Sequence, residues 1–298
     1  MTCRFLPKAR RIHTPIWLKF FAALGFVAAL LITPLTSWAA PLPQIDIAYG
    51  TNPENLLDIY QPDGSGLHHL VVFVHGGGWT GGKKRSAHAI AASITGAGYV
   101  LASVEYRKVP QTTPAGQAAD VAQAIAFLLA HSKEYGVAPG GFAIMGHSAG
   151  AHLAALLATD AHYLSDVRVD PTLAKAFVSL DGFYDIDAHM AVAKHGAEVF
   201  GTDPAQWGGV SPVKLLSKSP LARQFCLLHS GVNPRFADQA ERFAEALRAA
   251  GDHVQVAAAP GRTHGQLMDK FADPNEPMLG FTIQCLKSAG FSNYTNPR

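Results

Sequence analysis

Charged side chains are scarce in this sequence, at 15% of its 298 residues, whereas hydrophobic residues make up 48%. This composition excludes a disordered chain and indicates a compact globular protein. After the first forty residues, no internal repeat, low-complexity tract or linker divides the chain. We therefore predict one folded domain over residues 40–298.

Acidic residues are absent from the first 39 residues, which hold five of the 24 basic ones. An apolar run over 20–35 follows, and Ser37 and Ala39 are small residues at the two positions that a signal peptidase reads. We interpret residues 1–39 as a signal peptide cleaved after Ala39, and we expect a secreted or periplasmic protein. A membrane anchor is the alternative, because the apolar run is near the lower length limit for crossing a bilayer.

The basic character of the chain comes from this leader. Without it, 19 basic residues stand against 22 acidic ones, and the net charge falls from +2 to −3. We therefore expect no nucleic-acid partner, and no membrane association for the cleaved domain. The basic cluster Lys83–Arg85 is interpreted as solvated, with steering of an anionic substrate as the alternative.

Metal-binding and cysteine motifs are also few. The sequence has 14 histidines, but no H-E-x-x-H or other ligand spacing, so we expect no metal site. Of the three cysteines, Cys3 lies in the leader, and Cys226 and Cys285 are interpreted as buried packing residues. A disulfide between these two is left open, since the sequence does not place their Cα atoms.

Apolar segments and helix-like segments alternate along the chain, which is typical of an α/β sheet with crossover helices. We expect an opening hairpin at 45–49 and 56–60, and further strands at 71–74, 100–104, 142–145, 176–180, 225–229 and 254–258. Helices are predicted at 86–96, 117–131, 149–159, 237–250 and 278–288. The segments 160–172 and 186–220 break this alternation, and we interpret 186–220 as a lid or pocket wall, with an ordinary surface excursion as the alternative.

One motif lies where a predicted strand meets a predicted helix. Residues 146–150 read Gly-His-Ser-Ala-Gly, between an apolar run at 142–145 and the helix predicted at 149–159. A strand, a sharp turn and a helix in this order form a nucleophile elbow, in which the central serine hydroxyl is exposed above the sheet. This pattern predicts Ser148 as a nucleophile.

A second motif strengthens this prediction. The apolar strand at 71–74 runs directly into His-Gly-Gly-Gly-Trp at 75–79. Glycines let backbone N–H groups approach a ligand closely, and acyl transfer needs such donors for the oxyanion of its tetrahedral intermediate. We assign the oxyanion hole to the N–H groups of Gly77, Gly78 and Ala149.

With these two motifs, residues 45–290 resemble the α/β-hydrolase superfamily. The nearest groups are the HGGGW-type esterases related to hormone-sensitive lipase, the feruloyl-esterase-like carboxylesterases and the kynurenine formamidases. Further matches are SVEYR at 103–107, FGTD at 200–203 and THG at 263–265. The resemblance implies a mostly parallel central sheet with helices on both faces, and hydrolysis of an ester or amide without a cofactor.

A serine nucleophile needs a base, and histidine titrates in the right range. In this superfamily the order along the chain is serine, acid, histidine. His264 follows the last predicted strand, between Gly261 and Gly265, and is the predicted general base. The other histidines near motifs are expected to order the oxyanion loop (His75), to pack or hydrogen-bond near the site (His147, His152) or to be structural (His229, His253).

The acid departs from the family pattern. Related families carry Asp soon after the strand at 225–229, but here residues 229–236 read HSGVNPRF, with no carboxylate. We predict that Asp181, at the end of the preceding strand, accepts the Nδ1–H bond of His264 instead. The alternatives left open are a helix-capping Asp185, Asp238, Asn233 in a weakened triad, or no acid at all.

These features predict a serine carboxylesterase that acts on small or medium acyl esters through an acyl-enzyme intermediate. An arylformamidase-like amide hydrolase is one alternative, because Pro234-x-Phe236-x-x-Gln239 resembles that group. A non-catalytic binding module is the other, favoured only by the missing acid. The sequence indicates neither the natural substrate nor the oligomeric state.

Overall fold

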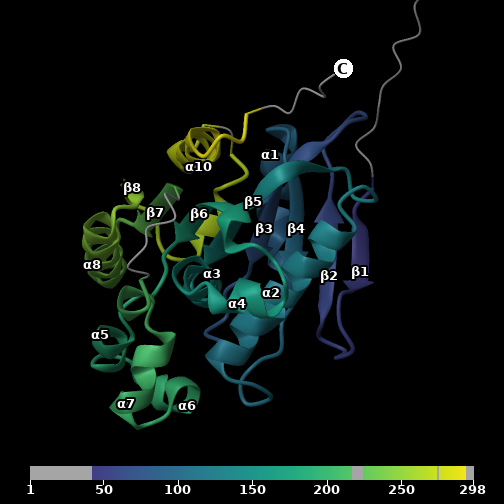
Figure 1. The fold of residues 1–298 in the computed structure, drawn as a ribbon. Coiled ribbons are helices and arrows are strands. Elements are labelled where there is room, and N and C mark those ends of the chain that lie inside the picture. Colours follow the sequence, from purple (N-terminus) through teal and green to yellow (C-terminus); the bar gives the residue numbers. More distant parts are fainter. Residues whose placement is uncertain (1–41, 217–223, 274, 293–298) are drawn as a thin grey trace, which may run out of the picture. The chain divides into compact units, whose positions relative to one another are not determined.

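An eight-stranded sheet forms the centre of the described part of the chain (Figure 1). The computed structural model describes residues 42–216, 224–273 and 275–292, which belong to one compact unit. The predicted signal peptide and its cleavage site after Ala39 lie outside the described residues. The strands are β1 (Gln44–Ala48), β2 (Leu56–Tyr60), β3 (His68–Val74), β4 (Val100–Val104), β5 (Val137–His147), β6 (Ala174–Leu180), β7 (Gln224–Ser230) and β8 (His253–Ala259).

The order of the strands in space is β1-β2-β4-β3-β5-β6-β7-β8. The opening hairpin β1–β2 is antiparallel, and β2 pairs antiparallel with β4. All other pairs are parallel. The predicted hairpin and the mostly parallel sheet are therefore confirmed. Strand β5 begins at Val137, earlier than predicted, because its first residue already pairs with His68 of β3.

Residues 70–74 of strand β3 are all apolar because both faces of this stretch are buried. Its residues Leu70, Val72 and Val74 face one core cluster, whereas Val71 and Phe73 face the other. All five are completely buried. A parallel strand that is covered by helices on both sides has no face towards solvent. Its residues therefore do not alternate between polar and apolar, as those of a strand with one exposed face do.

Helices cover both faces of the sheet (Figure 1). The core of one face includes residues of α2 (Pro114–Ala130), α3 (Ala149–Thr159) and α8 (Pro234–Ala250). The core of the other includes residues of α1 (His88–Gly96), α9 (Gln266–Asp269) and α10 (Pro277–Ser288). Helices α2 and α8 begin three residues earlier than predicted, because Thr113 and Asn233 cap them and a proline takes the first helical position.

The two irregular segments contain short helices. The first includes α4 (His162–Asp166) and a 3₁₀ turn at Pro171–Leu173. The second contains α5 (Ile186–Met190), α6 (Gly196–Phe200), α7 (Pro204–Trp207) and 3₁₀ turns at Gly208–Val210 and Pro212–Lys214, while residues 217–220 lie outside the described part. Figure 1 shows α5, α6 and α7 gathered at the bottom of the view, away from α1 and α10. Among the described helices, none is both long and apolar enough to cross a bilayer.

A disulfide joins Cys226 of β7 to Cys285 of α10. Both residues are completely buried, as predicted, and the pairing that the sequence left open is present. The bond links the sheet to the helix that covers one of its faces. It also lies on the strand whose far end, at Ser230, reaches the candidate site.

Candidate active site

Ser148 occupies the sharp turn between β5 and α3. Its φ of 57° is in the left-handed region, which a non-glycine residue rarely adopts and which marks a strained turn. Glycine is required at both flanking positions, because the backbone of other residues lies too close to leave room for a side chain. A Cβ on Gly146 would lie 2.5 Å from the Gly150 carbonyl oxygen, and a Cβ on Gly150 would lie 2.1 Å from that of Val74.

The structure brings Ser148, His264 and Asp181 into one hydrogen-bonded chain. Ser148 Oγ lies 2.9 Å from His264 Nε2, and His264 Nδ1 lies 2.9 Å from Asp181 Oδ2. With the imidazole proton on Nδ1, the serine hydroxyl donates to Nε2 and Nδ1–H donates to the carboxylate. The Asp181 side chain is completely buried, whereas that of His264 is 36% exposed. A hydroxyl, an imidazole and a carboxylate are thus in hydrogen-bond contact, which is the arrangement that a nucleophile, its base and an orienting acid require.

Asp181 is fixed at the point where β6 ends. Its own N–H donates to the Leu228 carbonyl of β7, and the Ser230 N–H donates to Asp181 Oδ1 at 2.6 Å. Its φ of 52° turns the chain away from the sheet at this residue. One carboxylate oxygen is therefore held by the neighbouring strand, and the other faces His264. The expected hydrogen bond between Asp181 and His264 is present.

The alternative acids have other partners. Asp185 caps α5 by accepting the Ala188 N–H, as its sequence context predicts. Asn233 caps α8, and Asp238 is paired with Arg242 on the surface. In the described part of the chain, none of these three has a recorded hydrogen bond or ion pair with His264.

Two rings hold the imidazole of His264 from either side. Phe236 is nearly parallel to it, with ring centroids 4.6 Å apart and planes 4° apart. His147 stacks at 4.5 Å, and its Nε2–H donates to the His264 carbonyl oxygen. Burial, together with the neighbouring His264, lowers the pKa of His147 to about 4, so this imidazole is neutral near pH 7. The prediction that His147 packs near the site is confirmed, whereas the contact of Phe236 was not predicted.

The predicted oxyanion loop packs directly against the elbow. A Cβ on Gly76 would lie 2.9 Å from Ser148 Cβ, which places the start of this loop beside the nucleophile. The loop is closed by a hydrogen bond from the Gly81 N–H to the Gly77 carbonyl, and Gly77 and Gly78 both have positive φ. The N–H groups of Gly77, Gly78 and Ala149 donate no hydrogen bond to another described residue. Within residues 42–216, 224–273 and 275–292 these three donors therefore have no hydrogen-bond acceptor.

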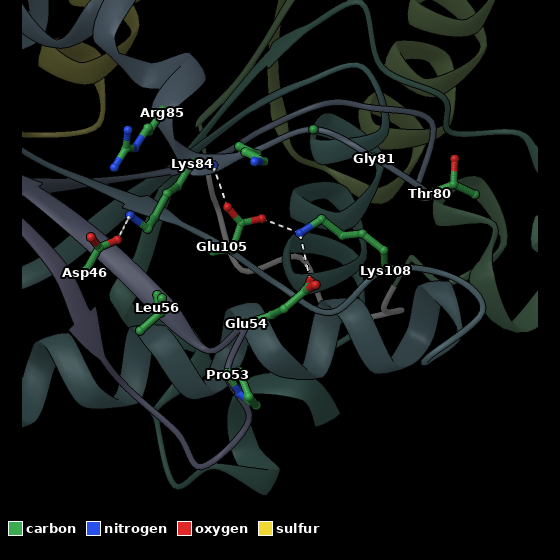
Figure 2. A pocket seen from close by; sticks show the side chains of 12 residues that line it. Asp46, Pro53, Glu54, Leu56, Thr80, Gly81, Lys84, Arg85, Glu105 and Lys108 are labelled. Atoms are coloured by element: carbon green, nitrogen blue, oxygen red, sulfur yellow. Dashed lines mark hydrogen bonds and ion pairs between the residues drawn. The ribbon is translucent and has the colours of Figure 1, made fainter.

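A buried ionic network supports the loop from behind (Figure 2). Glu105 accepts from His75 Nε2, from the Lys84 N–H and from Lys108 Nζ. Burial opposes the charge of Glu105, but the hydrogen bond and charge of His75 and the hydrogen bonds from Lys108 and the Lys84 N–H outweigh it and hold the pKa of Glu105 at about 2. His75 also bonds the Gly76 carbonyl through Nδ1, so its predicted role in ordering the loop is confirmed.

The interpretation of Lys83–Arg85 as solvated is wrong for its central residue. Lys84 is only 4% exposed, and its ammonium group lies 2.6 Å from both Asp46 and Asp58. These two carboxylates come from the opening hairpin, far away in the sequence. They provide the charge that a buried lysine requires. Lys83 and Arg85 are exposed, as expected.

Trp79 joins the oxyanion loop to the segment 186–216. It is buried, and its indole N–H donates to His152 Nδ1 at 3.0 Å. His152 in turn donates from Nε2 to the Val210 carbonyl at 2.7 Å, so its predicted packing near the site is confirmed. A cavity of about 280 Å³ beside Trp79 is lined by Gly78, Phe183, His189, Arg235 and residues of α6. The segment predicted as a lid or pocket wall therefore contributes to the wall of this cavity.

Comparisons with known proteins agree with this arrangement. Residues 57–191 match the BD-FAE family model. Esterase LipQ of Mycobacterium tuberculosis (strain ATCC 25618 / H37Rv) is 31% identical over 245 residues, which cover 74% of this chain and 56% of the relative. Isoprenylcysteine alpha-carbonyl methylesterase ICME of Arabidopsis thaliana is 28% identical over 248 residues, with the same coverage. The chain thus spans 56% of the length of these two relatives.

Solved structures share the fold. Esterase 2 of Thermogutta terrifontis superposes with a TM-score of 0.70 at 22% identity, covering 86% of this chain and 98% of the other. A truncated carbohydrate esterase from gut microbiota gives 0.67 at 20% identity, covering 84% and 98%. At these identities the likeness shows the fold alone. The chain therefore shares the fold of these esterases, matches the BD-FAE family model over residues 57–191 and is similar in sequence to relatives named as esterases.

Proposed function

We propose that the protein is a serine carboxylesterase that hydrolyses small or medium acyl esters, with Ser148, His264 and Asp181 as its catalytic triad. The observation that carries this proposal is the continuous hydrogen-bond chain from Ser148 Oγ through His264 to Asp181, beside three free N–H donors. The family and the relatives named as esterases favour ester substrates over other acyl compounds.

In the acylation step, His264 Nε2 removes the hydroxyl proton as Ser148 Oγ attacks the ester carbonyl carbon. Asp181 keeps the Nδ1 proton in place and stabilises the imidazolium that forms. The carbonyl oxygen becomes an oxyanion, which the N–H groups of Gly77, Gly78 and Ala149 are placed to bind. His264 then gives its proton to the alcohol oxygen, the carbon–oxygen ester bond breaks, and an acyl-serine remains.

Deacylation repeats these steps with water. His264 takes a proton from water, whose oxygen attacks the acyl carbon, and the same N–H groups stabilise the second oxyanion. The bond to Ser148 Oγ then breaks, and the imidazolium returns a proton to the serine. The products are a carboxylic acid and the original enzyme. Besides the ester, the reaction consumes only water.

A fluorophosphonate probe tests this proposal most simply. Such a probe phosphonylates an activated serine, so we expect labelling of the wild type and its loss in Ser148→Ala. Hydrolysis of 4-nitrophenyl acetate, with N-formylkynurenine as the amide comparison, then separates an esterase from an arylformamidase-like enzyme. Labelling that persists in Ser148→Ala, or a wild type that neither reacts nor hydrolyses, contradicts the proposal.

Export from the cytoplasm is the second part of the proposal. The leader over residues 1–39 has the basic start, apolar run and small residues of a signal peptide. The Cys226–Cys285 disulfide also supports export, because disulfides form and persist in oxidising compartments. N-terminal sequencing of the mature protein tests this directly, and the expected first residue is Ala40. A protein that retains Met1 in the cytoplasmic fraction contradicts it.

The segment 186–216 is proposed as the lid of the substrate pocket. Its α6 residues line the cavity next to Gly78, and its Val210 carbonyl binds His152 beneath the site. A substrate that enters this cavity must contact the segment. Shortening α6 should therefore change KM and the preference for acyl chain length, while the reactivity of Ser148 towards a small probe persists.

A further inference from the structure

Arg235 precedes Phe236, the residue that stacks on the candidate catalytic base His264, and it lines a cavity together with Gly78 of the candidate oxyanion loop. It is the second residue of α8, and the following Phe236 stacks on His264. Arg235 and Gly78 both line the cavity of about 280 Å³ described above. This volume is near the lower end of those typical of small-molecule sites. The cavity therefore adjoins the candidate oxyanion loop at Gly78.

The guanidinium group of Arg235 has no acidic partner among the described residues. Its recorded contacts are with the Phe183 ring, whose centroid lies 5.9 Å from Cζ, and with His189 Nδ1, 3.3 Å from Nη2. Burial and the charge of Arg235 lower the pKa of His189 to about 4, so this imidazole is a neutral acceptor near pH 7. The positive charge of Arg235 is therefore not neutralised by either contact.

Three of the six other described arginines differ in this respect, whereas Arg85, Arg168 and Arg248 likewise form no ion pair with a described residue. Arg107, Arg242 and Arg262 form ion pairs with Asp120, Asp238 and Glu276, respectively. The undescribed residues contain no Asp or Glu side chain that could serve Arg235 instead. A guanidinium has five N–H donors in a planar fork that matches a carboxylate, and one of those of Arg235 bonds to another described residue.

The charge of the cavity lining also favours a ligand that carries a carboxylate. Its cations are Lys194 and Arg235, and its one lining carboxylate among the described residues, Glu198, is paired with His195 at the exposed rim. Trp79 and Phe183 provide an apolar floor. The lining therefore combines flat apolar surface with an unpaired cation.

We propose that Arg235 makes this cavity a subsite for a carboxylate, so that the enzyme prefers esters carrying a carboxylate close to the scissile bond. The inference rests on the proposed esterase function. Arg235 acts here as a specificity-determining residue. It binds the substrate's carboxylate through its free N–H donors, while Phe183 and His189 hold the guanidinium in place.

Two matched pairs of esters test this inference, because the carboxylate could be on either side of the ester. The first pair is 4-acetoxybenzoate and 4-acetoxybenzamide, which differ on the alcohol side. The second is the 4-nitrophenyl esters of 4-carboxybenzoate and 4-carbamoylbenzoate, which differ on the acyl side. In each pair, the ratio of kcat/KM for acid over amide is compared between wild type and Arg235→Gln, which cancels intrinsic differences in reactivity.

We expect the acid-to-amide ratio of at least one pair to fall about tenfold in Arg235→Gln. A loss of this size is what the removal of a hydrogen bond to a charged group produces. The control is Arg248→Gln, the same change of charge at the far end of α8, which should leave both ratios at the wild-type value. Ratios that stay the same in Arg235→Gln for both pairs overturn the inference. That result is also expected if Arg235 only holds Phe183 in place.

A binding measurement separates this inference from the esterase proposal. The same compounds are titrated into Ser148→Ala and into Ser148→Ala with Arg235→Gln, where no turnover is needed. Tighter binding of the acid than of the amide, lost with Arg235, supports the subsite even if the wild type hydrolyses neither ester. Equal affinities for acid and amide in Ser148→Ala contradict it, whatever the activity of the wild type.

Discussion

Phe236 lies flat against the imidazole of His264, with ring planes 4° apart and centroids 4.6 Å apart. The other face of the same imidazole is covered by His147. Because Asp181 fixes only Nδ1, these two rings determine the tilt of His264 towards Ser148. The orientation of the candidate base therefore depends on packing as well as on the acid.

Replacing Phe236 by leucine should lower kcat about 3- to 10-fold, the factor that corresponds to the energy of an aromatic pair. KM should change less, since the ring touches the base. Phe281→Leu on α10 is the matched control, because Phe281 packs against the core of the other face of the sheet, whereas Phe236 belongs to the first core. Steady-state kinetics and melting temperatures of both variants check this. A Phe236→Leu enzyme with wild-type kcat would show that the stack does not orient the imidazole.

Glu105 is expected to act as a positioning residue for the oxyanion loop. Its two oxygens accept from His75 and from the Lys84 N–H, so an amide in Glu105→Gln must turn an N–H₂ group towards one of these donors. We expect kcat to fall by between about tenfold and 100-fold, with little change in KM. Loss of a whole oxyanion donor would lower kcat by about 100-fold or more.

Glu54→Gln is the control for this prediction. Glu54 also pairs with Lys108 (Figure 2), but it forms no hydrogen bond or ion pair with the described residues of the loop. Its kcat should equal that of the wild type. Equal kcat values for the two variants would mean that the ionic network stabilises the fold without aligning the oxyanion donors.

The buried His152 should make stability depend on pH. Burial lowers its pKa to about 4, whereas in the unfolded chain it is about 6.5. Between these values the unfolded chain binds more protons, so the free energy of unfolding falls as the pH drops from 6.5 towards 4, by at most about 1.4 kcal/mol per pH unit for this group. Denaturant titrations across this range should show a shallower fall for His152→Gln. Parallel curves for the two proteins would rule out a contribution from His152.

The disulfide should contribute measurably to stability. It joins residues 59 apart, and closing a loop of that length in the unfolded chain corresponds to about 4 kcal/mol. The double variant Cys226→Ser, Cys285→Ser should therefore unfold at a lower denaturant concentration, and a reducing agent should have the same effect on the wild type only. An unchanged midpoint in both experiments would contradict this.

Much of the fold could be predicted from local sequence. Strands buried on both faces are short apolar runs, and β4 has the bounds that its run predicts. The elbow and the oxyanion loop are also local, since their glycines are required by contacts within or between adjacent segments. Helix starts were less accurate, because Thr113 and Asn233 cap their helices before the apolar pattern begins.

The parts that were missed depend on contacts between distant segments. Lys84 looks solvated in a basic run, but Asp46 and Asp58 surround its ammonium group in the fold. The stack of Phe236 on His264 likewise requires that the start of α8 meets the loop after β8. Asp181 could be predicted as the acid from its place at the end of a strand and from the missing carboxylate after the next strand, but the hydrogen bond from Ser230 that holds it could not be.

The position of the acid on β6 is the central claim, and kcat of Asp181→Asn tests it most directly. Its controls are Asp185→Asn and Asp238→Asn, which change a helix cap and a surface pair. With an asparagine, the imidazolium loses its charge partner and the tautomer is no longer fixed, so kcat should fall by about 10³- to 10⁴-fold, while both controls stay close to the wild type. An Asp181→Asn enzyme that keeps more than about a tenth of the wild-type kcat, far above the loss expected for a triad acid, would contradict the account.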